Sequence, residues 1–298
     1  MIESAKDLSR VIYIMGTARS GSTVLEVILG SAQGAFGAGE ITAFPQDGFK
    51  ENKRCSCRKD IKECVVWSQV LRLLSINRDA LRKWATIQRQ VDWHRGFIKQ
   101  IFFGISDRKI RDYERYNLKI LAAIKETTHC DIIIDSSKYA GRALALHRIL
   151  RKQVVFICLT RSPSGLMHSF QKSNKDEQYP KNKISTLIYY LVVLVSLRIA
   201  CNRLGNQVYQ LRYEDFVSSP TDTIEKIERW AKLDLSAAKQ RIRSSQPFLV
   251  GHIVTGNRLR KKGKVMLKNN DQGRFASMAF GEKLVVGIMR IWQWGLRF

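Results

Sequence analysis

The 298-residue chain has few of the features that divide a polypeptide into independent units. It contains only 5 prolines, and it has no long Pro/Gly linker, internal repeat or low-complexity stretch. Hydrophobic residues make up 45% of the chain. A chain of this length buries about 75% of its unfolded surface, so a substantial core is expected. These observations predict a single domain over residues 1–298.

Acidic residues are scarce. The chain has 26 Asp and Glu against 51 Lys and Arg, which gives a formal net charge of +25. An excess of this kind favours anionic partners such as nucleotides, nucleic acid, acidic glycans or an acidic membrane surface. It does not choose among them, and a solvated basic surface explains many of the individual charges.

A hydrophobic run long enough to span a membrane is also missing. The most apolar stretch, 184–197, is shorter than the roughly 20 residues that a spanning helix needs, and Ser185, Thr186 and Ser196 interrupt it. A buried core helix is the preferred interpretation. Residues 1–10 are polar and mixed in charge, so no secretory signal is expected. We expect the protein in the cytoplasm or at the periphery of a membrane.

The six cysteines are too few for a disulfide scaffold in a chain of this length. Cys55, Cys57 and Cys64 form a C-x-C-x6-C cluster ahead of Trp67. Zinc is conceivable there, but no fourth ligand lies nearby in the sequence and the spacing is not a standard zinc pattern. We therefore expect reduced structural thiols and no metal.

Short apolar segments indicate the strands. Strands are expected at residues 11–15, 131–135, 154–159 and 208–211. Continuous apolar strands separated by helices are typical of a parallel sheet that is covered on both faces. The predicted fold is α/β, a P-loop-like parallel sheet of about four to five strands flanked by helices. A basic helical insertion of two or three helices is expected at about residues 64–128.

A loop of small residues, Gly16 to Thr23, follows the first predicted strand and precedes a helix. Such a loop lets backbone N–H groups and the positive end of the helix surround an anion. Arg19 can add a bidentate contact to phosphate or sulfate oxygens, and Ser22 and Thr23 can donate hydroxyl hydrogen bonds. An ordinary strand-to-helix turn is the alternative. The loop has Ser22 where nucleotide hydrolases need lysine, which argues against an ATPase.

Residues 18–23, Ala-Arg-Ser-Gly-Ser-Thr, resemble the loop that holds the 5′-phosphosulfate of PAPS (3′-phosphoadenosine 5′-phosphosulfate) in PAPS-dependent sulfotransferases, especially the carbohydrate and bacterial branches. Arg161 and Ser169, eight positions apart after the third predicted strand, resemble the pair that binds the donor's 3′-phosphate. The resemblance implies in-line sulfuryl transfer from PAPS to a hydroxyl without a required metal. It also implies that the donor contacts Arg19, Ser20, Gly21, Ser22 and Thr23.

The C-terminal part extends the resemblance. Residues 210–216, with Pro220, resemble an architectural "RYEDL…P" segment. Residues 256–260 resemble the "GNxxR" loop of bacterial members. Arg260 and Lys261 then become candidates for a basic strap across the nucleotide phosphate, although a solvated basic loop is nearly as good an explanation for the lysines.

On the acceptor side, Glu40 follows the first predicted helix, near the position where related enzymes carry a Glu that takes the acceptor's proton. A helix-cap or ion-paired Glu is the structural alternative. Asp135 opens a turn that ends at Lys138 and resembles the turn beside the transferring group, so Lys138 is the candidate for stabilising the leaving group. His168 and His252 are alternative bases.

Two other functions remain open at this point. A P-loop small-molecule kinase would use ATP and magnesium, with Asp135 as a candidate metal ligand. A non-enzymatic nucleic-acid-binding protein would explain the basic and aromatic residues of 82–119. The preferred prediction is a sulfotransferase that acts on a hydroxyl group of a carbohydrate or glycolipid. The acceptor could be anionic or associated with a membrane. No nucleic-acid partner is expected. The acceptor's identity and the oligomeric state stay open.

Overall fold

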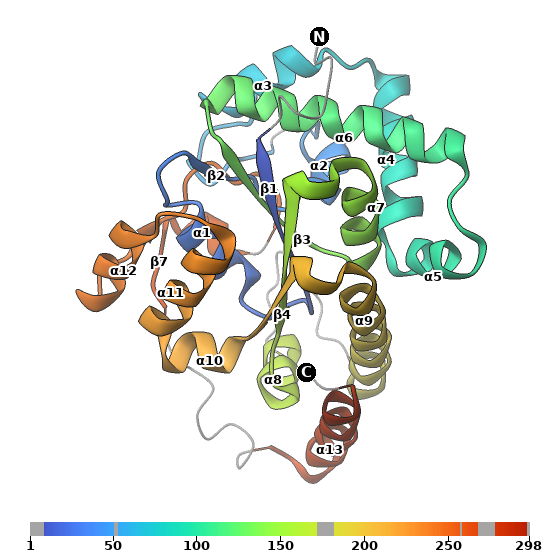
Figure 1. Cartoon of the computed structure of the whole chain (residues 1–298), viewed down its shortest axis with the longest axis vertical. Coiled ribbons are helices and arrows are strands. Elements are labelled where there is room, and N and C mark those ends of the chain that lie inside the picture. The colour runs from blue at the N-terminus through green and yellow to red at the C-terminus, as the bar shows by residue number, and fades with distance from the viewer. Residues whose placement is uncertain (1–8, 51–52, 172–181, 257, 268–277, 297–298) are drawn as a thin grey trace.

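The computed structural model describes residues 9–50, 53–171, 182–256, 258–267 and 278–296. Its main sheet has five parallel strands in the order β2-β3-β1-β4-β5 (Figure 1). The strands are β1 (Arg10–Gly16), β2 (Ala35–Gly37), β3 (Ile132–Lys138), β4 (Val154–Thr160) and β5 (Val208–Arg212). The predicted fold class, a P-loop-like parallel sheet flanked by helices, is confirmed. The short edge strand β2 was not among the predicted strands.

Helices connect and cover these strands. The α-helices are α1 (Ser22–Leu29), α2 (Phe44–Asp47), α3 (Trp67–Leu74), α4 (Arg78–Asp92), α5 (His94–Phe103), α6 (Asp107–Thr128), α7 (Ala140–Leu150), α8 (Pro163–Gln171), α9 (Lys183–Leu204), α10 (Tyr213–Ser218), α11 (Pro220–Ala231), α12 (Ser236–Arg243) and α13 (Phe280–Gly295). Short 3-10 helices are η2 (Ile41–Ala43), η3 (Arg151–Gln153), η4 (Gly205–Gln207) and η5 (Arg258–Lys262). A small antiparallel pair consists of β6 (Phe248–Leu249) and β7 (Lys264–Val265).

The central strand β1 separates two hydrophobic cores. Successive side chains of a strand point to opposite faces, and β1 is apolar on both. Val11, Tyr13 and Met15 enter the core formed with α3, α4, α6, α7 and α9. Ile12 and Ile14 enter the core formed with α1, α11 and α12. Figure 1 shows these two groups of helices on opposite sides of the sheet. This two-sided burial explains why the strand is a continuous apolar run.

Residues 64–128 contain four helices, α3 to α6, instead of the two or three expected. Asn77 caps α4 by accepting a hydrogen bond from the Ala80 backbone N–H at 2.8 Å. Trp84, Ile87 and Val91 then form the buried stripe of this helix at the spacing expected for one helical face. The charged residues of the segment lie mostly on the other side, as in an ordinary amphipathic helix.

Within the described part of the chain, one helical stretch, Lys183–Gln207, is long and apolar enough to cross a membrane by length and composition. Its buried side chains belong to protein cores. Val193 and Leu197 pack in the core on the α7 face of the sheet, and Tyr190 and Leu194 pack with α8 and α13. Ile184 and Ile188 of α9 belong to neither core and are exposed.

Candidate active site

The predicted site residues gather at the carboxyl ends of the parallel strands, where ligands bind in open α/β sheets. β1 ends at the small-residue loop, β3 ends at Lys138, and β4 is followed directly by Arg161. The loop requires glycine at position 21, which has a φ of +93° and precedes α1. A Cβ atom there would come within 2.5 Å of the Tyr213 ring. The ring of Tyr213, at the start of α10, therefore packs directly against the loop.

The loop holds two buried hydroxyl groups without hydrogen-bond partners. Thr17 and Ser20 are both fully buried, and among the described residues neither side-chain oxygen has a partner. A buried unpaired polar group costs about 1–3 kcal/mol. Here the two hydroxyls lie in the loop that leads into the N-terminus of α1, where an anion would satisfy them. Ser20 was among the residues predicted to bind the PAPS donor, whereas Thr17 was not.

Arg161 links the end of β4 to the loop. Its side chain is only 9% exposed, and Nη1 donates a hydrogen bond to the carbonyl oxygen of Arg19 at 2.6 Å. The guanidinium also stacks over the Tyr213 ring, 4.6 Å from its centroid. The structure therefore brings the two predicted donor motifs together. Ser169 lies half-buried on α8, eight residues after Arg161.

Glu40 and Lys138 are brought into direct contact. The Lys138 ammonium donates a hydrogen bond to Oε1 of Glu40, and their side chains are 15% and 23% exposed. Glu40 precedes η2, and its carbonyl oxygen accepts a hydrogen bond from the Thr255 hydroxyl at 2.7 Å. The candidate base and the candidate leaving-group cation thus form one partly buried ion pair.

A buried glutamate that was not predicted, Glu26, supports both ends of this pair. Its carboxyl oxygens accept hydrogen bonds from the Gly39 backbone N–H and, at 2.7 Å, from the Ser136 hydroxyl. Burial raises the pKa of Glu26 to about 8, because the charged form loses its hydration. A glutamate inside an otherwise apolar helix was the available sequence signal. Its hydrogen bonds hold Gly39, which directly precedes Glu40, and Ser136, which lies two positions before Lys138.

Asp135, the candidate magnesium ligand of the kinase alternative, is enclosed in the protein. Its carboxylate accepts hydrogen bonds from the backbone and side chain of Ser137 and from Nε of Arg142 at 2.7 Å. Arg142 is itself fully buried and donates to Oδ1 of Asn117 at 2.8 Å and to the Tyr113 hydroxyl at 3.0 Å. This network ties the insertion helix α6 to the turn that carries Lys138, and it occupies the oxygens that a metal would need.

Aromatic side chains lie beside the ion pair. The Tyr189 hydroxyl accepts a hydrogen bond from the Ala18 N–H at 2.9 Å, and burial, with a contribution from the charge of Glu40, raises the pKa of Tyr189 to about 12. The His94 ring lies 5.4 Å from Tyr139 and 6.0 Å from Tyr189, measured between centroids. Trp93, 43% exposed, stacks on Tyr139 at 6.5 Å. These residues form an aromatic wall that spacing alone did not indicate.

The remaining predicted residues have different surroundings. Arg260 is mostly buried, and its Nη1 donates to the carbonyl oxygen of Arg54 at 3.0 Å, while Lys261 is exposed on η5. Asn257 of the "GNxxR" segment lies outside the described residues. His168 is half-buried on α8. His252 faces Cys64, with 3.2 Å between Nδ1 and Sγ, and this contact raises the pKa of His252.

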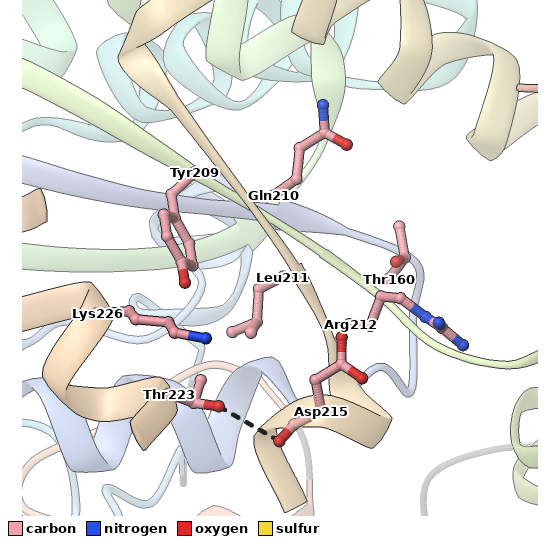
Figure 2. Close-up of a pocket in the computed structure, with 8 residues that line it drawn as sticks. All are labelled: Thr160, Tyr209, Gln210, Leu211, Arg212, Asp215, Thr223 and Lys226. Carbon is pink, nitrogen blue, oxygen red and sulfur yellow. Dashed lines mark hydrogen bonds between the residues drawn. The ribbon is translucent and has the colours of Figure 1, made fainter. Parts of the chain in front are cut away.

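A polar pocket of about 240 Å³ lies next to this region, at the edge strand β5 (Figure 2). Its walls come from the ends of β4 and β5 and from α10 and α11, namely Thr160, Tyr209, Gln210, Leu211, Arg212, Asp215, Thr223 and Lys226. None of the predicted site residues lines it, but Thr160 directly precedes Arg161. The pocket is therefore adjacent to the donor motif in the chain and separate from the ion pair.

A sequence model of the sulfotransferase family matches residues 11–237 of the chain. The fold is similar to the "Sulfotransferase Domain from the Curacin Biosynthetic Pathway", with 14% identity, 95% of this chain and 98% of that chain covered, and a TM-score of 0.51. It is also similar to sulfotransferase STF9 from Mycobacterium avium, with 13% identity, 80% and 67% covered, and a TM-score of 0.50. No curated protein sequence gives a significant match.

Proposed function

The chain belongs to the sulfotransferase family, and from this premise we propose that it transfers a sulfuryl group from PAPS to an acceptor hydroxyl. The observation that carries the proposal is the anion cradle around Thr17 and Ser20, which is joined to a second cationic position through Arg161. PAPS carries negative charge at both its 5′ and 3′ ends, so it needs two such positions close together.

In the proposed complex the 5′-phosphosulfate lies in the loop, bound by Arg19, Ser20, Gly21, Ser22 and Thr23. The two unpaired hydroxyls and the first N–H groups of α1 would become its hydrogen-bond donors. Arg161 and Ser169 would bind the 3′-phosphate. The hydrogen bond from Nη1 of Arg161 to the Arg19 carbonyl oxygen holds the guanidinium beside the loop, where the nucleotide would lie. Lys261 and Arg260 would approach from η5, with Arg260 partly committed to Arg54.

Glu40 and Lys138 would carry the chemistry. The carboxylate of Glu40 accepts the proton from the acceptor hydroxyl as that oxygen attacks sulfur in line with the leaving phosphate. The positive charge of Lys138 stabilises the negative charge that builds on the bridging oxygen. Their ion pair keeps both groups in place before the substrates arrive. Arg19, at the 5′ end, adds charge stabilisation at the sulfuryl oxygens.

We propose a carbohydrate or glycolipid as the acceptor. Its binding surface would be the aromatic wall of Trp93, His94, Tyr139 and Tyr189, because flat rings pack against the apolar faces of sugars. Tyr139 contacts both Trp93 and His94, and it lies close enough to Glu40 to interact with its charge. The kinase alternative loses its support, since the family match is to sulfotransferases and Asp135 is enclosed.

The direct experiment is transfer of radiolabelled sulfate from PAPS to pools of sugars, glycolipids and small hydroxyl metabolites. Label that appears in an acceptor fraction with the wild type and not with Glu40→Gln supports the function. Label that stays with the donor in every pool, while the protein still binds the donor, would leave the chain without the activity proposed here.

We further propose that the protein works at the periphery of a membrane, through exposed apolar side chains on α9 and α13. These helices pack together and expose Ile184, Ile188, Val192, Val195, Phe280, Leu284, Ile288, Ile291, Trp292 and Trp294. The charge of +25 complements anionic headgroups. Tryptophan side chains are common where a protein meets the headgroup region.

Cosedimentation with phosphatidylglycerol vesicles tests this location. Ile291 and Leu249 are 70% and 67% exposed, on α13 and on β6 respectively. Ile291→Ser should weaken vesicle binding roughly tenfold, the effect of about 1.5 kcal/mol of apolar contact, and Leu249→Ser should not. Equal binding by both variants and the wild type, or no binding at all, would overturn the membrane proposal.

A further inference from the structure

The cysteine cluster is completed by a histidine from the other end of the chain. Cys55, Cys57, Cys64 and His252 place their ligand atoms within 4.8 Å of one another. Nδ1 of His252 lies 3.2 Å from Sγ of Cys64 and 4.0 Å from Sγ of Cys55. In a tetrahedral zinc site, with Zn–S near 2.3 Å and Zn–N near 2.0 Å, neighbouring ligand atoms are about 3.5–3.8 Å apart. The two distances from His252, 3.2 and 4.0 Å, lie on either side of the nitrogen–sulfur spacing of such a site, and the four ligand atoms are near enough to share one ion.

The backbone around the cluster is tightly determined. Cys55 N–H donates to the Lys59 carbonyl at 3.0 Å, and Arg58 N–H donates back to the Cys55 carbonyl at 2.9 Å. This turn includes Arg58 at a φ of +72°, and it is closed by the bridge between Arg54 and Asp60. Cys64 follows, with its N–H bonded to the Asp60 carbonyl at 2.9 Å. The turn therefore presents three sulfurs toward one point.

The backbone around His252 is held by Ser56 of the same turn and by Trp67 at the start of α3. The backbones of Ser56 and Ile253 are joined by an N–H to carbonyl bond of 2.9 Å, and the Ser56 hydroxyl accepts from Ile253 N–H at 2.7 Å. The Trp67 indole N–H donates to the carbonyl oxygen of His252 at 2.6 Å. The imidazole is thereby aimed at the sulfurs by contacts that do not involve the ring itself.

We propose that Cys55, Cys57, Cys64 and His252 bind a structural zinc ion. Three thiolates and one imidazole are soft and borderline ligands that select zinc over magnesium or calcium. Four protein ligands leave no open position for a substrate, so the role is structural and not catalytic. The complex would carry one net negative charge, and the same turn supplies basic neighbours at Arg54 and Arg58.

The proposed ion would connect distant parts of the site. Cys64 and His252 are 188 residues apart in sequence. The segment after His252 carries Thr255, whose hydroxyl bonds the Glu40 backbone, and Arg260, which bonds the turn at Arg54. A metal at this point would hold the C-terminal segment against the turn of Glu40. The site does not depend on the proposed donor or acceptor, so it is tested independently of sulfuryl transfer.

Metal analysis of the full-length, untagged protein, purified without chelator, tests the proposal. Elemental mass spectrometry should find about one zinc per chain in the wild type. His252→Ala and Cys57→Ala should lower the zinc content to background. Cys130→Ala, which removes a buried thiol outside the cluster, is the matched control and should keep the metal. Cys57 is only half-buried, so its variant should fold even if changes at the buried cysteines do not.

Cobalt replacement supplies a second readout. The Co²⁺ form should show the intense visible bands of tetrahedral cobalt with thiolate ligands, and Cys57→Ala should lose them. Three results would overturn the proposal. These are a wild type that takes up neither zinc nor cobalt, metal that persists in both ligand variants, or a thiol count without reductant that shows two of the cluster cysteines in a disulfide.

Discussion

The most informative single change is Arg161→Ala, because this guanidinium is assigned to the donor's 3′-phosphate and also contacts the loop. The side chain is 9% exposed, so a phosphate that it binds is largely removed from water. Truncation of a buried, charged hydrogen-bond partner costs about 2–4 kcal/mol, which corresponds to a roughly 30- to 900-fold loss of affinity. We expect this loss in calorimetric titrations with adenosine 3′,5′-bisphosphate.

The contact to Arg19 calls for a control, since the variant could weaken binding by disturbing the loop. Adenosine 5′-monophosphate, which lacks the 3′-phosphate, separates the two effects. If Arg161 binds the 3′-phosphate, Arg161→Ala should reduce affinity for the bisphosphate far more than for the monophosphate. Equal losses for the two ligands would refute the assignment and make Arg161 a support for the loop. Arg229→Ala, an exposed arginine on α11, should change neither affinity.

Three further predictions concern the acid–base groups and the metal requirement. Glu40→Gln should reduce turnover by roughly 10²–10⁴-fold with donor affinity and melting temperature retained, since glutamine can still accept from Lys138; unchanged turnover would move the base to His168, because His252 is assigned to the proposed zinc site. Burial raises the pKa of Glu26 from 4.5 to about 8. As the pH rises, the unfolded chain therefore loses this proton before the folded protein does. Between these two pKa values, the contribution of Glu26 to the free energy of unfolding falls by about 1.4 kcal/mol per pH unit. Glu26→Gln should gain stability relative to the wild type as pH rises from 5 to 8 in parallel denaturant titrations, and a constant difference would contradict the buried acid. Sulfuryl transfer should continue without magnesium after brief chelation, with zinc content followed in the same sample, whereas recovery only on addition of magnesium would favour a kinase.

The sheet could be predicted because its strands are buried on both faces, which makes the segments around Val11 and Val154 continuous apolar runs. The edge strand β2 was missed because Ala35–Gly37 has three residues, none fully buried, and lies among glycines. The small-residue loop and Arg161 could be proposed as the donor site from the sequence because both belong to short local motifs. Their contact through Arg19 follows from the parallel order of β1 and β4.

Long-range partners account for what the sequence did not reveal. Arg142 is the one arginine in the first turn of α7, and only the fold supplies Asp135 and Asn117 around it. The cysteine cluster lacked a fourth ligand among its neighbours in the chain, because His252 comes from a segment 188 residues beyond Cys64. Such partners have no fixed spacing, so no local pattern could have indicated them.

Calorimetric titration of the wild-type protein with adenosine 3′,5′-bisphosphate and with ATP tests whether PAPS is the donor. The proposed 5′-phosphate site around Ser20 would accept either nucleotide, while Arg161 is proposed to bind a 3′-phosphate, which ATP does not have. We expect micromolar-range binding of the bisphosphate, on the order of −8 kcal/mol, and much weaker binding of ATP. Tighter binding of ATP would contradict this expectation.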